Sequence, residues 1–263
     1  MTMTRRQRSK LGRGILYLLA VAIFAAAVLK ADWERIGRSF FNLETARDML
    51  PQVLSVAAKN TVVYAVLSFG IGLVIALVLA LMRLSPVRPY RAFAIAYIEL
   101  FRGLPALVTL ILFGFGIPIA FDMRIPGGRV GAAVLGLSVV AGAYLAETIR
   151  AGIEAVPKGQ REAARSLGMS ETRTMFTIVL PQAFRIMIPP LTNEMVLLIK
   201  DTSLFFVIGS TPATRELVKF ARDFMQGQRN ATPLTVIALV YLLITLPLTF
   251  LVRRLERRTG RGR

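Results

Sequence analysis

The chain has 263 residues, of which 55% are hydrophobic, with no cysteine, no histidine and a net charge of +18. Its mean hydropathy of +0.59 is high for a soluble domain of this length, because such domains carry more charge and fewer aliphatic residues. The absence of His and Cys excludes His/Cys zinc sites, thiol nucleophiles, Ser-His-Asp triads and disulfides. The composition therefore favours a membrane protein that does not depend on those chemistries.

The excess positive charge could suggest a nucleic-acid partner. The Arg and Lys residues, however, lie mainly at the ends of apolar runs and do not gather on one face. In a membrane protein this pattern sets the orientation and contacts anionic lipid. We therefore expect membrane lipid, and no nucleic acid, as a partner.

Six apolar runs each approach the ~20 residues that a helix needs to cross a bilayer. In chain order they are residues 15–29, 61–82, 93–120, 130–149, 181–208 and 234–252. Gly103 and Pro105 interrupt the third run and should bend it. The sequence predicts an all-α, polytopic membrane helix bundle with six spans.

Both termini are strongly basic, MTMTRRQRSKLGRG at the start and RRLERRTGRGR at the end. The positive-inside rule then places both termini in the cytoplasm, with the basic tail 257–263. Residues 1–60 are expected to hold a cytoplasmic tail, an anchor span and an extracytoplasmic amphipathic segment. The first run could instead be a secretory signal, because Ala25–Ala27 resemble a cleavage site, but we expect a retained anchor.

The segment after the first run is predicted to follow the membrane surface. Trp33, Phe40 and Phe41 suit the aromatic belt at a membrane interface. Residues 43–59 form an amphipathic stretch that we expect to lie along the bilayer before the second span.

A polar, helix-forming stretch separates the fourth and fifth runs. Pro157 fits a first helical turn, and Gly168 fits the left-handed position that follows a helix end. Ser170 can cap a second helix over residues 171–179. Ala163, Ala164 and Leu167 are expected on one face of the first helix. These residues describe either a solvated connector or a knob that fits a groove on a partner.

The same stretch carries a recognisable pattern. Glu162-Ala163-Ala164, three residues, Gly168, nine residues, Ile178, one residue and Leu180-Pro181 match the signature loop of ABC importer permeases. IELFRGLPALV (98–108), AYLAETIRAGIEAVPKGQREAARSLGMS (143–170), LPQAFRIMIPPLTNEMVLLIKDTSL (180–204) and the closing RRLERR resemble the polar amino-acid branch of that family. The resemblance covers roughly residues 55–258.

The resemblance implies a type I ABC importer permease domain over residues 61–256, with a five-span core and one added N-terminal span. It implies that residues 157–180 form the cytoplasmic coupling hairpin. The residues expected to meet the ATPase are Glu162, Ala163, Ala164, Leu167 and Gly168.

The chain has no Gly-x-x-x-x-Gly-Lys-Ser/Thr phosphate loop, so this chain is expected to hold no cofactor and not to hydrolyse ATP by that route. The resemblance implies a separate ABC ATPase that binds ATP and Mg²⁺. It also implies an extracytoplasmic amino-acid-binding protein and a second permease subunit, identical or related. The expected location is the inner or plasma membrane of a bacterial cell.

Charged side chains inside the apolar runs are candidates for a translocation path, because each costs about 2.5 to 3.5 kcal/mol to insert. The candidates are Glu99, Arg102, Asn193, Glu194, Lys200, Asp201 and Ser203. Lys200 and Asp201 together offer a cation and an anion to a zwitterion. Two structural alternatives stay open: a self-satisfied Glu99–Arg102 pair, and a packing ion pair on the fifth span.

Two further groups are interpreted structurally. Glu147 and Arg150 are expected to anchor the hairpin. Ser138, Gly142 and Ala146 form a small-residue stripe that lets another helix approach closely.

The sequence therefore predicts the permease subunit of an ATP-driven amino-acid importer. The alternative is a self-sufficient secondary transporter or channel, which would show inverted repeats with matching broken helices. An intramembrane enzyme would need carboxylate or Ser/Lys chemistry, and the sequence contains no catalytic motif of that kind.

Overall fold

The computed structural model describes residues 5–228 and 230–260, and these ranges contain helices and connecting turns but no strand. The predicted basic tails fall partly outside the description, at residues 1–4 and 261–263. The helices are α1 (Arg5–Lys30), α2 (Trp33–Phe40), α3 (Leu43–Gln52), η1 (Val53–Ala58), α4 (Lys59–Leu84), α5 (Arg88–Gly103), α6 (Ala106–Ile111), η2 (Leu112–Gly116), α7 (Ile117–Phe121), α8 (Gly128–Glu154), α9 (Lys158–Ser166), α10 (Glu171–Thr174), η3 (Met175–Val179), α11 (Leu180–Asp201), η4 (Thr202–Val207), α12 (Leu217–Gln228) and α13 (Thr232–Gly260). The all-α prediction is confirmed.

Five helical stretches are long and apolar enough to cross a membrane. They are Arg13–Lys30, Trp33–Leu84, Gly128–Glu154, Glu171–Val207 and Thr232–Arg257. A sixth is reached only if α5 and the helices after it count as one span, since these are bent by 103° between Gly103 and Ala106. The bend predicted from Gly103 and Pro105 is present.

The centre of the bundle is the pair α4 and α8, joined by α5 and α11. Close approach depends on small residues, because a Cβ on Gly72 would lie 3.0 Å from the Cβ of Ala141. Gly142 in turn packs against Ile75 of α4. Ser138 and Ala146 are fully buried, so the predicted small-residue stripe on α8 serves helix packing.

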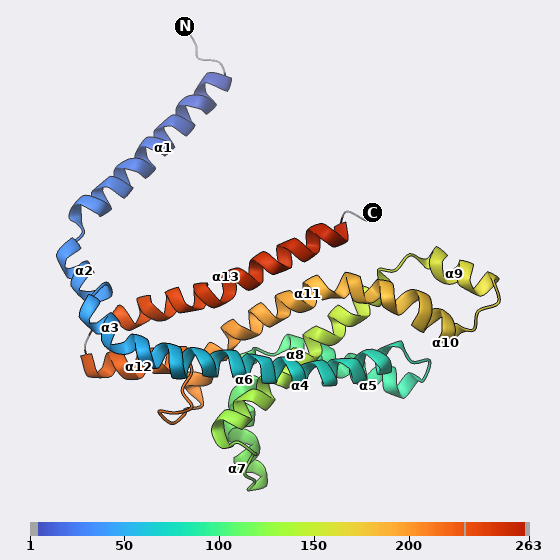
Figure 1. Cartoon of the computed structure of the whole chain (residues 1–263). Helices are drawn as coiled ribbons and strands as arrows, with labels where there is room; N and C mark the ends of the chain where they lie inside the picture. The colour runs from blue at the N-terminus through green and yellow to red at the C-terminus, as the bar shows by residue number, and fades with distance from the viewer. Residues whose placement is uncertain (1–4, 229, 261–263) are drawn as a thin grey trace.

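Helix α1 stands apart from the rest of the chain, extending away from the bundle in Figure 1. Its apolar window, Arg13–Lys30, has no buried residue, whereas 67% of the corresponding window of α8 is buried. Within this chain, α1 is therefore attached mainly through α2, for example by the hydrogen bond from the Trp33 indole to the Val28 carbonyl at 2.8 Å.

A second apolar core joins α3, η1, α12 and α13. Met49 and Val53 are fully buried there. The apolar face of residues 43–59 therefore packs against other helices of the chain. The expectation that this stretch lies along the membrane surface stays a prediction. The partner helix α12 lies between the fifth and sixth apolar runs, where the sequence analysis predicted no helix.

The two cores define two ends of the molecule. In Figure 1 the α9–α10 hairpin projects from one end, and α2, α3 and α12 gather at the other. Helices α4, α11 and α13 run between the two ends.

Candidate coupling hairpin and translocation path

The hairpin, residues 157–180, begins with α9 and turns sharply at Gly168, whose φ is +80°. This left-handed conformation is costly for any residue with a Cβ, which explains the glycine. The turn is closed by backbone hydrogen bonds from Gly168 to Arg165 and from Met169 to Ala164, at 3.0 and 3.2 Å. The Ser170 side chain accepts from the Arg173 N–H at 3.3 Å and caps α10, as predicted.

The structure separates residues that we expected on one face. Ala164 is 5% exposed and is the buried residue of α9, which packs against η3. Leu167 is 85% exposed, and Glu162 and Ala163 are also exposed. Ala164 therefore holds the hairpin together, while the other three and the Gly168 turn present an outward surface with an apolar tip.

The second arm of the hairpin has no break before the membrane. α10 continues through the π-helical turn η3 into α11, which begins at Leu180 with Pro181 in its first turn. Proline is tolerated there because its missing N–H falls in the first turn. The second arm of the hairpin and α11 are thus one continuous helical run.

The first arm follows the end of α8, whose last turns are held by charge and by packing. Arg150 forms ion pairs with Glu147 and Glu154 of the same helix. The Glu147–Arg150 pair is therefore present within α8, and its role as an anchor of the hairpin stays a prediction. Gly152 lies so close to α11 that a Cβ there would come within 2.0 Å of the Met187 Cγ. Helices α8 and α11 are therefore in close contact near the base of the hairpin.

The path candidates lie on three helical elements, α5, α11 and η4. Glu194 of α11 lies within electrostatic range of Asp201 and of Arg102 of α5. The Arg102 guanidinium also lies 5.6 Å from the centre of the Tyr144 ring of α8. Arg102 of one predicted set and Glu194 and Asp201 of the other thus lie in one region, beside the α5 break. We call the seven candidate residues the polar face.

Much of the polar face is open in the single chain. Glu99, Arg102, Asn193 and Lys200 are exposed, and Glu194, Asp201 and Ser203 are half-buried. In the described residues, no ion pair joins Glu99 to Arg102, although that pair was one of our alternatives. Charges of both signs at this depth need protein or water around them, because contact with lipid tails is costly.

At the end opposite the hairpin, residues 209–216 are fastened to α4, and we call them the tethered segment. The Asn60 amide donates to the carbonyls of Ala213 and Arg215, at 2.9 and 3.1 Å. The Tyr64 hydroxyl donates to the Thr214 carbonyl at 2.8 Å. Sequence reasoning missed these contacts, which join residues about 150 positions apart.

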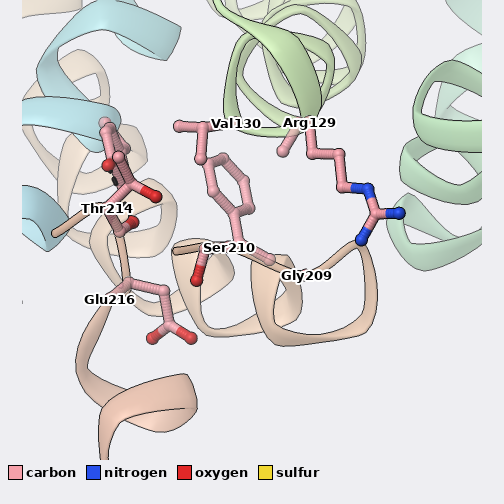
Figure 2. Close-up of a pocket in the computed structure, with 9 residues that line it drawn as sticks. Arg129, Val130, Gly209, Ser210, Thr214 and Glu216 are labelled. Atoms are coloured by element: carbon pink, nitrogen blue, oxygen red, sulfur yellow. Dashed lines mark hydrogen bonds between the residues drawn. The ribbon is translucent and has the colours of Figure 1, made fainter. Parts of the chain in front are cut away.

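The tethered segment closes over a small pocket, shown in Figure 2 with Arg129 and Val130 on one side and Glu216 and Ser210 on the other. Glu216 is 2% exposed and accepts hydrogen bonds from the N–H groups of Val218 and Lys219, at 2.5 and 2.7 Å. It thereby caps α12. The sequence does contain a signal for this helix: the capping carboxylate Glu216 is followed by apolar residues at helical spacing, Leu217, Phe220 and Phe224.

A multi-span helical protein with a protruding polar hairpin and a charged face within its apolar spans has the architecture of a membrane transport component. Residues 46–261 match the family described as binding-protein-dependent transport system inner membrane component. The chain belongs to this family, and it is a multi-pass membrane protein.

Individual relatives agree with this assignment. The L-cystine transport system permease protein TcyB of Bacillus subtilis is 37% identical, over 87% of this chain and 92% of the relative. The glutamine transport system permease protein GlnP of Escherichia coli K12 is 39% identical, over 76% of this chain and 90% of the relative.

A solved structure shows the same fold. The crystal structure of an amino acid ABC transporter with histidines has a TM-score of 0.75 and 35% identity, covering 82% of this chain and 98% of that one. The inward-facing MetNI methionine ABC transporter, at 18% identity and a TM-score of 0.64, shares the fold alone. The predicted resemblance to ABC importer permeases is confirmed.

Proposed function

We propose that this chain is the membrane-spanning permease subunit of an ATP-driven importer of amino acids. The observation that carries the proposal is the hairpin, whose exposed tip is built from the signature residues and is continuous with α11. Relatives that are 34 to 39% identical include permeases for cystine, glutamine, arginine and glutamate, which supports the amino-acid class but favours no single substrate.

In the proposed arrangement the hairpin lies in the cytoplasm and docks on a separate ABC ATPase, which binds ATP and Mg²⁺. Leu167 fits an apolar groove, and Glu162, Ala163 and Gly168 form the surrounding contact. The opposite end, with α2, α3 and α12, faces an extracytoplasmic amino-acid-binding protein. Both termini are then cytoplasmic, at the membrane surface that attracts their basic residues.

The polar face supports a second permease subunit, identical or related. Arg102, Asn193 and Lys200 are exposed in the single chain although they lie within apolar spans. Their exposure to lipid tails is disfavoured, so a second subunit that faces them across a shared, hydrated path satisfies them. Lys200 and Asp201 then offer opposite charges to the carboxylate and ammonium groups of an amino acid.

As a proposed mechanism, ATP-driven closure of the ATPases displaces the hairpin. Because α10, η3 and α11 form one helical run, the displacement reaches the helix that carries Glu194, Lys200 and Asp201. The α8–α11 contact at Gly152 carries α8 with it. The path then opens outward to receive the amino acid, and hydrolysis resets the inward state.

The test is to purify the tagged chain in mild detergent and identify its companions by mass spectrometry. We expect an ABC ATPase in near-equal amount, and any second permease will be identified in the same experiment. If no ATPase appears, and the purified chain alone moves amino acids in liposomes without ATP, the alternative of a self-sufficient secondary transporter replaces the proposal.

A further inference from the structure

The carboxyl group of Glu216 lines the pocket beneath the tethered segment. Glu216 is buried, and no ion pair to it occurs among the described residues. Its partners are the two backbone N–H groups at the start of α12.

The groups around Glu216 come from every element packed against it. α4 contributes Tyr64, α13 contributes Tyr241, and Arg129 of α8 lines the same pocket. On α12, Lys219 and Asp223 are in electrostatic range of Glu216, but they pair with each other.

Arg215, the cation of the tethered segment next to Glu216 in the sequence, interacts with other groups. The Arg215 guanidinium stacks 4.3 Å from the centre of the Phe220 ring and donates to the Gln52 amide oxygen at 2.9 Å. Burial raises the pKa of Glu216 to about 7, although its two backbone hydrogen bonds favour the ionised form.

The Glu216 carboxyl lies at the end of a segment that connects the path helices to α12. Helix η4 begins directly after Lys200 and Asp201. The tethered segment follows η4 and leads into α12. It is held by Tyr64 and Asn60 of α4, and the buried Ser210 hydroxyl has no hydrogen-bond partner among the residues that the structure describes. If the segment lifts, Glu216 and Ser210 reach water.

We propose that Glu216 is a proton-binding site that locks the tethered segment: the protonated carboxyl keeps the segment closed on α4, α8 and α13, and the ionised carboxyl releases it. The sign follows from linkage. A group that binds its proton more tightly in the closed state favours closure at low pH, and this advantage is lost as the pH rises through 7. The lock does not depend on which substrate the chain carries.

Thiol labelling measures the opening directly, because the chain has no cysteine of its own. The full-length Ser210→Cys variant in lipid nanodiscs is treated with a water-soluble maleimide from pH 5.5 to pH 8. The same thiol is measured in the Ser210→Cys/Glu216→Gln double variant. We compare the labelling rate of Ser210→Cys with that of the double variant as a ratio, first over second, in which changes in thiol reactivity cancel. Linkage predicts that this ratio rises roughly 25-fold over the pH range.

Two controls separate a lock from other effects. The Ser55→Cys variant, at an exposed position of η1, reports the intrinsic reactivity of a thiol at each pH. Tyr64→Phe in the Ser210→Cys background removes one tether and should raise labelling at every pH, with the same pH dependence.

A rate ratio between the Ser210→Cys chain and the double variant that is constant with pH overturns the proposal. If the double variant does not fold, the Ser210→Cys rate corrected by the Ser55→Cys rate decides instead: a roughly 25-fold rise supports the lock and a flat profile overturns it. None of these readouts requires transport, so they are independent of the proposed function.

Discussion

At the hairpin end, α9 is held by the single buried residue Ala164 and by hydrogen bonds between neighbours in the sequence, such as Ser166 to Glu162. At the opposite end, the tethered segment is held by Asn60 and Tyr64, about 150 residues away. We therefore expect the hairpin to move with α11 as one unit, and the other end to resist motion until several long-range hydrogen bonds break.

The largest expected effect is at the Gly168 turn. Gly168→Val places a β-branched residue at φ +80°, in the region where such residues are rarely found, although the space around it is open. We expect at least a tenfold loss of ATP-driven uptake with normal membrane insertion, measured in proteoliposomes with the partner ATPase. Gly168→Asn is the control, because Asn enters this region more easily and should retain most uptake. Equal uptake by the Val variant would show that the turn does not matter for coupling.

A substitution in the polar face should reduce uptake without weakening the binding of the ATPase to the hairpin. Lys200→Met removes the cation beside Asp201 and leaves Arg102 as the one cation of the face against the carboxyl groups of Glu99, Glu194 and Asp201. We expect a loss of uptake of roughly tenfold, with unchanged co-purification of the ATPase. Arg185→Met, an exposed cation on the same helix nearer the hairpin, is the control and should keep uptake near normal. Wild-type uptake by Lys200→Met contradicts a role in the path.

Packing at the base of the hairpin is the next test. Gly152→Ala places a methyl group against Met187 of α11, and we expect a loss of about 1 to 3 kcal/mol in the free energy of unfolding. Gly159→Ala, where nothing lies within 4 Å, should instead stabilise α9 by about 0.5 to 1 kcal/mol. Thermal unfolding of the two variants in detergent checks the difference in sign, and a shift in the same direction refutes the close α8–α11 contact.

The smallest effect is expected for one tether of the opposite end. Tyr64→Phe removes the hydrogen bond to the Thr214 carbonyl and keeps the stacking on Phe205. The loss should be about 0.5 to 1.5 kcal/mol, measured by thermal unfolding. No change in stability would mean that the segment is held without this hydrogen bond.

Much of the fold follows from local pattern. The apolar runs locate the long helices, Gly103 and Pro105 locate the bend, and Ser170 and Gly168 locate the hairpin turn. These features depend on a few neighbouring residues, so the sequence contains them directly.

The missed features depend on partners that are distant in the sequence. Residues 43–59 are amphipathic, but whether the apolar face meets lipid or protein depends on α12 and α13. The spacing in α9 puts Ala164 near Ala163, yet η3 covers only the former. The joining of Arg102 with Glu194 likewise requires the packing of α5 beside α11.

The most direct test of the central claim uses Leu167→Cys as the only thiol in the chain, in a complex with the candidate ATPase. A short cysteine-reactive photo-crosslinker at this exposed hairpin tip should link the chain to the ATP-binding subunit, and the same reagent on Ser55→Cys should not. The account predicts a crosslink whose yield changes when ATP is added. A complex that transports normally but gives no crosslink from position 167 would contradict it.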